Sequence, residues 1–98
     1  MVYHIVMWKI SDDVDKEKTA NTIKEKLEAL NGQIDVIKDL TVGINFNETD
    51  AASDIVLVSK FETKADLSEY INHPLHKAVG AEFVRPNVKE RRVVDYEI

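Results

Sequence analysis

The sequence has no cysteine among its 98 residues, and it has only three glycines and two prolines. The absence of cysteine excludes disulfide bonds, thiolate metal sites and a cysteine nucleophile. The glycines, Gly32, Gly43 and Gly80, form neither a Gly-x-Gly-x-x-Gly motif nor a phosphate-binding loop, and there is no Gly-x-Ser-x-Gly motif. We therefore expect no nucleotide cofactor, and the sequence indicates no other cofactor.

The chain is also short of positive charge and of long apolar runs. Thirteen Lys and Arg residues against eighteen Asp and Glu residues give a net charge of −5, which disfavours binding to nucleic acid or to an anionic membrane. No apolar run approaches the roughly 18 residues of a membrane span. Lys9, Asp12 and Asp13 follow the first apolar residues too soon for a signal peptide. We expect a cytoplasmic protein that binds neither nucleic acid nor membrane.

A small basic cluster, Lys89, Arg91 and Arg92, lies near the end of the chain. Acidic residues interleave with it along the same segment. This mixture favours a solvated strand edge over a phosphate site.

The first half of the chain predicts a strand, a helix and a second strand. Residues 2–10 are rich in β-branched and aromatic side chains, apolar on both faces of a strand. Acidic residues at 12, 13 and 15 are helix-start candidates, and Asn31-Gly32 is expected to end the helix. Its apolar face is Ala20, Ile23, Leu27 and Leu30. A second strand is expected over about 37–46, with one face formed by Leu40, Val42, Ile44 and Phe46.

The second half repeats this plan with an extra helix. Residues 54–61 alternate as a strand, and Thr63 with Asp66 three positions later predicts a capped helix. Pro74 disfavours a helical backbone at His73 and suits the first turn of a third helix, which Pro86 stops. The expected buried face of that helix is Leu75, Ala78, Val79 and Phe83. The closing strand is expected over 91–98.

This order of elements predicts one α+β domain over residues 1–98. Residues 1–46 and 53–98 share a plan, which is the split βαβ arrangement of a ferredoxin-like fold. It has a four-stranded antiparallel sheet with helices on one face. The other face carries too many apolar side chains to remain wet, so we expect a homodimer through this open face.

Histidines are the residues that folding alone does not explain. His4 lies in an apolar strand, where a buried imidazole needs a hydrogen-bond partner. The other two, His73 and His76, follow Tyr70 at spacings of three. His4 is either a satisfied core histidine or a functional one, and His73 is expected to cap and turn the chain.

Four segments together resemble the stress-responsive dimeric α/β-barrel family over essentially the whole chain. They are Tyr70-Ile71-Asn72-His73-Pro74-Leu75-His76, Gly43-Ile44-Asn45-Phe46, residues 54–62 and Val93-Val94-Asp95-Tyr96-Glu97. The resemblance implies two sheets packed face to face as a homodimeric barrel. It also implies a pocket for a hydrophobic or aromatic small molecule between sheet and helices, without assigning a reaction.

Polyketide cyclases of the same superfamily have a similar strand histidine and Tyr-x-x-His-Pro-x-His segment. The resemblance carries a catalytic role to His4, His76 and Tyr70 as candidates. An imidazole can remove a proton next to a carbonyl, while a phenol or second imidazole donates to the enolate oxygen. Asp54 and Leu27 depart from the cyclase pattern, which has a histidine and a tyrosine there. The remaining expected pocket residues are Val6, Trp8, Val56, His73 and Asp54, the last at the rim, where it either orients a histidine or faces solvent.

Two further chemistries stay open at this point. A monooxygenase is an alternative to a cyclase or isomerase, because such enzymes resemble this barrel superfamily and Trp8 is a weak reason to consider one. A transition-metal site is disfavoured, since His73 and His76 have no convincing ligand set around them. Magnesium sites leave little sequence trace, so the sequence does not decide that case.

Overall fold

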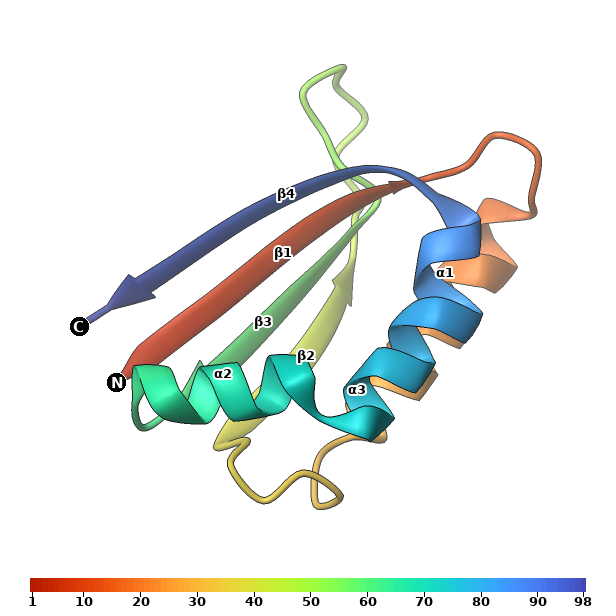
Figure 1. Cartoon of the computed structure of the whole chain (residues 1–98). Coiled ribbons are helices and arrows are strands. Elements are labelled where there is room, and N and C mark those ends of the chain that lie inside the picture. Colours follow the sequence, from red (N-terminus) through yellow and green to blue (C-terminus); the bar gives the residue numbers. More distant parts are fainter.

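The computed structural model describes all residues from 1 to 98, as one antiparallel sheet with helices on one side (Figure 1). The strand order is β2-β3-β1-β4, so the first strand is central and the last strand is an edge. This is the predicted split βαβ arrangement. The elements are β1 (Val2–Ile10), α1 (Lys16–Glu28), β2 (Asp39–Ile44), β3 (Ile55–Phe61), α2 (Lys64–Asn72), α3 (Pro74–Val79), a π-helical turn (Gly80–Val84), a 3₁₀ turn (Arg85–Asn87) and β4 (Val88–Glu97).

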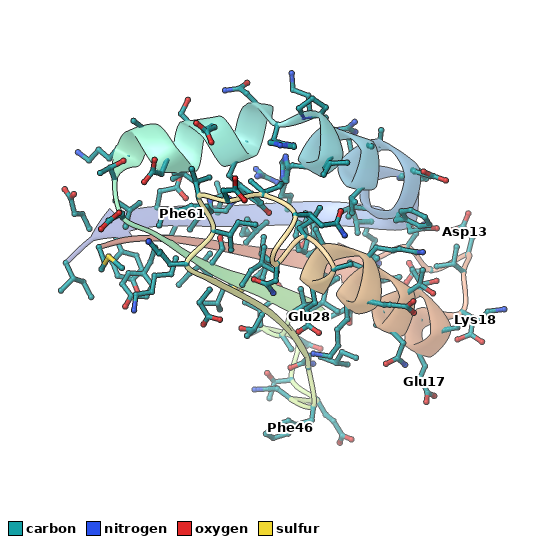
Figure 2. All side chains as sticks on the ribbon, turned by 90° about the horizontal axis from the view of Figure 1, so that it is seen from below. Asp13, Glu17, Lys18, Glu28, Phe46 and Phe61 are labelled. Carbon is teal, nitrogen blue, oxygen red and sulfur yellow. The ribbon has the colours of Figure 1, made fainter.

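The two faces of the sheet differ because side chains alternate along each strand. On β1 the even-numbered residues are buried under the helices, and the odd-numbered ones are partly or fully exposed on the other face. The strand β3 alternates in the same way, with Phe61 fully buried. Figure 2 shows Phe61 between helices and sheet. The functional candidates on these strands are thereby sorted into two separate surfaces.

Helix α1 begins where the acidic residues predict and ends earlier than expected. The Asp15 side chain accepts a hydrogen bond from the Lys18 amide at 3.0 Å and caps the helix. The helix ends at Glu28, followed by irregular turns in which Leu30 is still buried. Gly32 has a φ of 80°, so it supplies a left-handed turn residue after the helix rather than its terminus.

Glu28 ties the end of α1 to the edge strand β2. Its carboxylate accepts hydrogen bonds from the Lys24 ammonium at 2.8 Å and from the Val42 amide at 3.0 Å. The hydrogen bond from Lys24 and then that from Val42 lower the pKa of Glu28. Figure 2 shows Glu28 on the side of α1 next to the sheet. The Glu28 carboxylate therefore satisfies the Val42 amide on the outer edge of β2.

The second strand is shorter than expected, and its outer end is exposed. Pairing between β2 and β3 stops at Ile44 opposite Ile55, after which the chain leaves the sheet. Leu40 and Val42 are buried as predicted, but Ile44 is 44% exposed and Phe46 is 96% exposed. The expected apolar face fails at Phe46 because no strand or helix reaches that far (Figure 2).

Pro74 and His73 separate α2 from α3 as the sequence predicts. Thr63 caps α2 by accepting from the Asp66 amide at 3.1 Å. His73 has an extended backbone, and its Nδ1 accepts from the Leu75 amide at 3.1 Å, with Pro74 in the first turn of α3. This cap sets the direction of α3 and hence the position of His76.

The third helix does not keep its expected buried face. It passes into the π-helical turn at Gly80, and each extra residue in such a turn rotates the side chains that follow. Leu75, at 40%, and Ala78 are already exposed before this turn, although Val79 packs against the core as expected. At the end of the turn, Val84 rather than Phe83 is buried. Strand β4 then starts at Val88, earlier than expected.

The core lies between the sheet and the helices. None of the helices combines the length and the hydropathy that a membrane span requires. The opposite face of the sheet is uncovered (Figure 1). Tyr3 and Tyr96 stack there with ring centroids 5.2 Å apart. By strand register this open face consists mainly of Tyr3, Ile5, Met7, Thr41, Val56, Val58, Arg92, Val94 and Tyr96.

Candidate functional site

A cavity of about 530 Å³ opens between the sheet and the segment from α3 to β4. We call it the histidine cavity because His4 and His76 both line it. The rest of its lining combines apolar walls with charged groups: Val6, Trp8, Leu27, Leu57, Gly80, Val84, Arg85, Val88, Lys89, Glu90 and Arg91. Its volume falls in the range of about 300–1,000 Å³ that is typical of small-molecule sites.

His4 is held on the floor of this cavity by a carboxylate from the neighbouring strand. It lies opposite Asp95 in the pairing of β1 with β4, and its Nδ1 is 2.5 Å from Asp95 Oδ1. The His4 side chain is 4% exposed and that of Asp95 is 47% exposed. Because an ionised carboxylate only accepts hydrogen bonds, Nδ1 carries the proton and Nε2 of neutral His4 is an acceptor.

His76 reaches the cavity from α3 and is held in a similar way. Its Nδ1 donates to the Ile71 carbonyl at 3.0 Å, which leaves Nε2 of the neutral ring as an acceptor. Burial lowers the pKa of His76, against the hydrogen bond to Ile71, and the positive charges of Arg91 and Arg85 lower it further. The ring is therefore neutral at physiological pH.

Tyr70 connects the two histidines from behind the cavity lining. Its ring centroid is 4.4 Å from that of His76 and 6.2 Å from that of His4, and it also packs on Phe61 at 5.1 Å. Tyr70 is fully buried, and its hydroxyl is the only buried side-chain polar atom without a hydrogen-bond partner. Burial raises the pKa of the Tyr70 phenol far above its ordinary range, so the hydroxyl stays protonated.

Three cationic side chains line the mouth, but only two lack an acidic partner. Lys89 Nζ is 2.8 Å from Asp12 Oδ2, and this hydrogen bond raises the pKa of Lys89. Arg85 and Arg91 form no salt bridge. Glu90 lies 3.8 Å from Lys9 Nζ. The mouth therefore has a surplus of positive charge although the chain as a whole is acidic.

The structure brings five of the sequence-predicted residues together and separates three from them. His4, His76, Val6 and Trp8 line the histidine cavity, and Tyr70 packs against the two histidine rings from behind the lining. Val56 does not belong to the cavity, because strand alternation puts it on the open face.

Asp54 and His73 have structural contacts instead of the expected places at the cavity. Asp54 Oδ2 accepts from the Ile10 amide at 2.7 Å, so this carboxylate secures the end of β1 and orients neither histidine. His73 uses Nδ1 for the cap of α3 and is not part of the lining.

Asp95 is the residue that sequence reasoning missed. The sequence shows it only as one acidic residue among the basic ones of the last strand. The feature that could have revealed it is the antiparallel pairing of the first and last strands. The two chain ends meet there, because Met1 and Ile98 exchange backbone hydrogen bonds at 3.0 Å. That register places residue 95 opposite residue 4.

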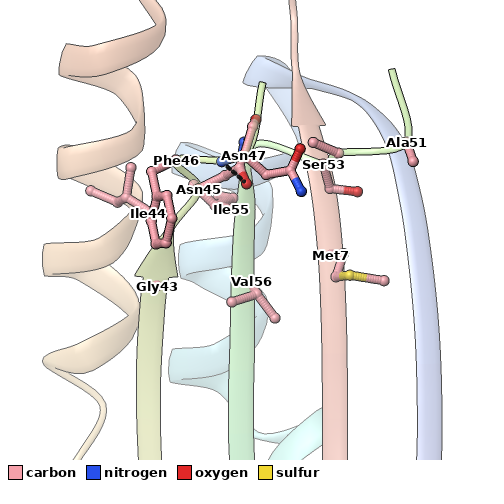
Figure 3. Close-up of a pocket in the computed structure, with 11 residues that line it drawn as sticks. Met7, Gly43, Ile44, Asn45, Phe46, Asn47, Ala51, Ser53, Ile55 and Val56 are labelled. Carbon is pink, nitrogen blue, oxygen red and sulfur yellow. Dashed lines mark hydrogen bonds between the residues drawn. The ribbon is translucent and has the colours of Figure 1, made fainter. Parts of the chain in front are cut away.

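A second hollow, of about 510 Å³, lies at one end of the open face beneath the loop 45–53 (Figure 3). Met7 and Val56 form its floor, and Phe46 stands at its side (Figure 3). It holds no titratable lining residue. No group of three or more His, Cys, Asp or Glu residues anywhere in the chain is placed to hold a metal ion. The histidine cavity is thus the place where the chain concentrates acid–base groups.

Comparison with known proteins places this chain in a family. The chain is 33% identical over 96 residues to a stress-response A/B barrel domain-containing protein from Arabidopsis thaliana. This match covers 98% of the chain and 36% of the relative, so the chain spans about a third of that protein's length.

Solved structures agree with this placement. A dimeric protein of unknown function with a ferredoxin-like fold from Bacteroides fragilis is 38% identical with a TM-score of 0.89, over 99% of this chain and 95% of that one. A hydroxynitrile lyase from Passiflora edulis is 20% identical with a TM-score of 0.85, over 99% and 92% of the two chains, which is a likeness of fold alone. The model of the stress responsive A/B barrel domain matches residues 2–98, and the chain belongs to that family.

Proposed function

We propose that this protein binds a hydrophobic small molecule in the histidine cavity and does so as a homodimer. The observation that carries the proposal is the convergence of His4 and His76, from opposite halves of the chain, on one cavity with apolar walls. Each imidazole has its Nδ1 occupied, so both can offer Nε2 to a ligand. A ligand with a polar hydrogen or an acidic C–H next to a carbonyl fits this pair.

The homodimer follows from the open face of the sheet. Val94 is 57% exposed, Tyr96 41% and Met7 39%, all on one surface that no helix covers (Figure 1). Contiguous apolar surfaces of this kind mark interfaces. The Bacteroides fragilis relative is dimeric. A second copy packed by the same face would complete the barrel.

The binding proposal is tested with a neutral aromatic ketone, 2-acetylnaphthalene, by isothermal titration calorimetry. We expect one saturable site per chain. His76→Ala should weaken binding by about tenfold, equivalent to ~1.4 kcal/mol. Lys77→Ala is the matched control from the same helix, because the Lys77 side chain is exposed and does not line the cavity. Absence of saturable binding, or an equal loss in both variants, would overturn the proposal.

Acid–base catalysis on a carbonyl compound is the second candidate, and the contact of His4 with Asp95 favours it. A base whose ring is held by a carboxylate is the usual arrangement of a proton-abstracting histidine. In such a step the C–H bond next to the carbonyl breaks, its proton goes to Nε2 of one imidazole, and its electron pair forms an enolate whose negative charge lies on the carbonyl oxygen. The carboxylate of Asp95 stabilises the imidazolium if His4 is that base. This candidate covers cyclases and isomerases.

Two further expectations from the sequence remain predictions. A monooxygenase stays an alternative on grounds of fold alone. Trp8 lines the cavity as an apolar wall, and no contact assigns it a chemical role. A cytoplasmic location likewise stays a prediction.

A further inference from the structure

The pair of unpartnered arginines at the cavity mouth indicates what kind of molecule enters. We propose that the ligand is an amphiphilic anion, whose carboxylate or phosphate group is held by Arg85 and Arg91 while its apolar body extends to His4 and His76. This inference rests on the proposed binding function and names the ligand class of the same site.

The two arginines come from separate elements of the fold. Arg85 comes from the 3₁₀ turn and Arg91 from β4, and both line the same cavity. The positive charges of both arginines lower the pKa of His76, so they lie close enough to act on the same site. Arginine binds carboxylate and phosphate through paired N–H donors, and it stays charged at every physiological pH.

The two arginines differ from the neighbouring lysines in having no acidic partner. The neighbouring cations of the chain are neutralised: Lys89 by Asp12 and Lys9 by Glu90. Strand alternation also divides the basic cluster of the last strand, because Arg91 lies opposite Trp8 on the cavity side and Arg92 lies opposite Met7 on the open face. The cluster that the sequence presents as a solvated edge therefore contributes one free guanidinium to the cavity.

The cavity walls beyond the arginines are apolar. Leu27, Leu57 and Val84 line the cavity beyond the arginines. A small inorganic anion would leave these walls empty, and a wholly neutral ligand would leave both guanidinium groups unused. A molecule with one anionic end and an apolar remainder matches both regions.

The test compares probes that share one body and differ in one group. Isothermal titration calorimetry at low salt would measure 2-naphthoate, 2-naphthyl phosphate, neutral 2-naphthylmethanol and cationic 2-naphthylmethylammonium. We expect at least one of the two anions to bind about tenfold more tightly than the neutral probe, and the cation most weakly. Whichever anion binds more tightly identifies the source as a carboxylic acid or a phosphate ester.

Variants assign the effect to the arginines. Arg85→Gln and Arg91→Gln should each reduce, several-fold, the ratio of the affinity for the anion to the affinity for 2-naphthylmethanol. Lys77→Gln removes the same charge from the exposed surface of α3 and should change neither affinity. Raising the ionic strength should reduce the preference, since the guanidinium groups are exposed.

Failure of this inference differs from failure of the proposed function. If all four probes bind equally well, or if the arginine variants keep the full preference, the anion site is wrong and the binding function stands. If no probe binds and 2-acetylnaphthalene does not bind either, both are wrong.

Discussion

His4 and Asp95 are 91 residues apart in the sequence and directly opposite each other across the pair of β1 and β4, with Nδ1 and Oδ1 2.5 Å apart. One partner is buried and the other is half-exposed. The contact satisfies an imidazole that would otherwise be a buried polar group without a partner. It also fixes the ring orientation, so that its other nitrogen is available to the cavity.

Asp95→Asn should preserve the fold and impair proton transfer. The amide keeps a hydrogen bond to His4 but loses the negative charge that stabilises its protonated ring. With 2-acetylnaphthalene in deuterated water, we expect exchange of its methyl hydrogens to slow by about 10²–10⁴-fold, the usual effect of losing a positioned acid–base group. Mass spectrometry would follow the exchange.

Glu97→Gln is the matched control for that experiment, because Glu97 is two residues further along the same strand face and its nearest cation is Lys64, at 3.9 Å. It should leave the exchange rate unchanged. Equal rates in the wild type and Asp95→Asn, both above the buffer rate, would show that Asp95 takes no part in the proton transfer. Rates equal to the buffer rate would remove the catalytic candidate altogether.

His76 should titrate below its ordinary pKa of 6.5, because burial and the nearby positive charges disfavour its protonated form. Carbon-detected NMR of the imidazole across pH 4–8 would give the midpoint. Arg85→Gln combined with Arg91→Gln should move it upward. A midpoint above 6.5 in the wild type would contradict the assigned environment.

The same shift makes stability depend on pH. The unfolded chain binds a proton at His76 at higher pH than the folded chain does, so the contribution of His76 to stability is present above about pH 6.5. It should be lost as the pH falls from there through the folded pKa. In His76→Gln, urea unfolding should lack this part of the pH dependence.

Tyr70→Phe should raise the free energy of unfolding by about 1 kcal/mol, because a buried hydroxyl without a partner costs free energy and its removal leaves the ring packing intact. Tyr96→Phe is the control, since Tyr96 is 41% exposed and should change stability by less than ~0.5 kcal/mol. Urea unfolding would measure both. A loss of stability in Tyr70→Phe would mean that the hydroxyl has a partner within the folded protein.

Val94→Asp should convert the proposed dimer to a monomer, because it places a charge among the apolar side chains of the open face. Light scattering at micromolar concentration should give twice 11.2 kDa for the wild type and 11.2 kDa for the variant. Ala65→Asp adds the same charge at an exposed position on α2, on the helical side, and should remain dimeric. A monomeric wild type would refute the homodimer.

Local sequence patterns were sufficient for the elements and their order. The alternation over residues 2–10, the Thr63 cap and the His73-Pro74 break depend on interactions within a few residues, and the structure confirms all three. Phe46 and the last helix were mispredicted because burial depends on what lies above a side chain. The chain leaves the sheet before Phe46, and the π-helical turn rotates the residues after Gly80.

The sequence by itself determined that His4 lies on the same strand face as Val6 and Trp8, because the two-residue period of a strand requires it. Only the tertiary structure decided which carboxylate reaches His4. Asp54 and Asp95 both stand next to strands, and the register of β4 against β1 brings Asp95 to the imidazole while Asp54 bonds the Ile10 amide. Register between strands so far apart in the sequence is set by the packing of the whole sheet, so no local pattern reveals it.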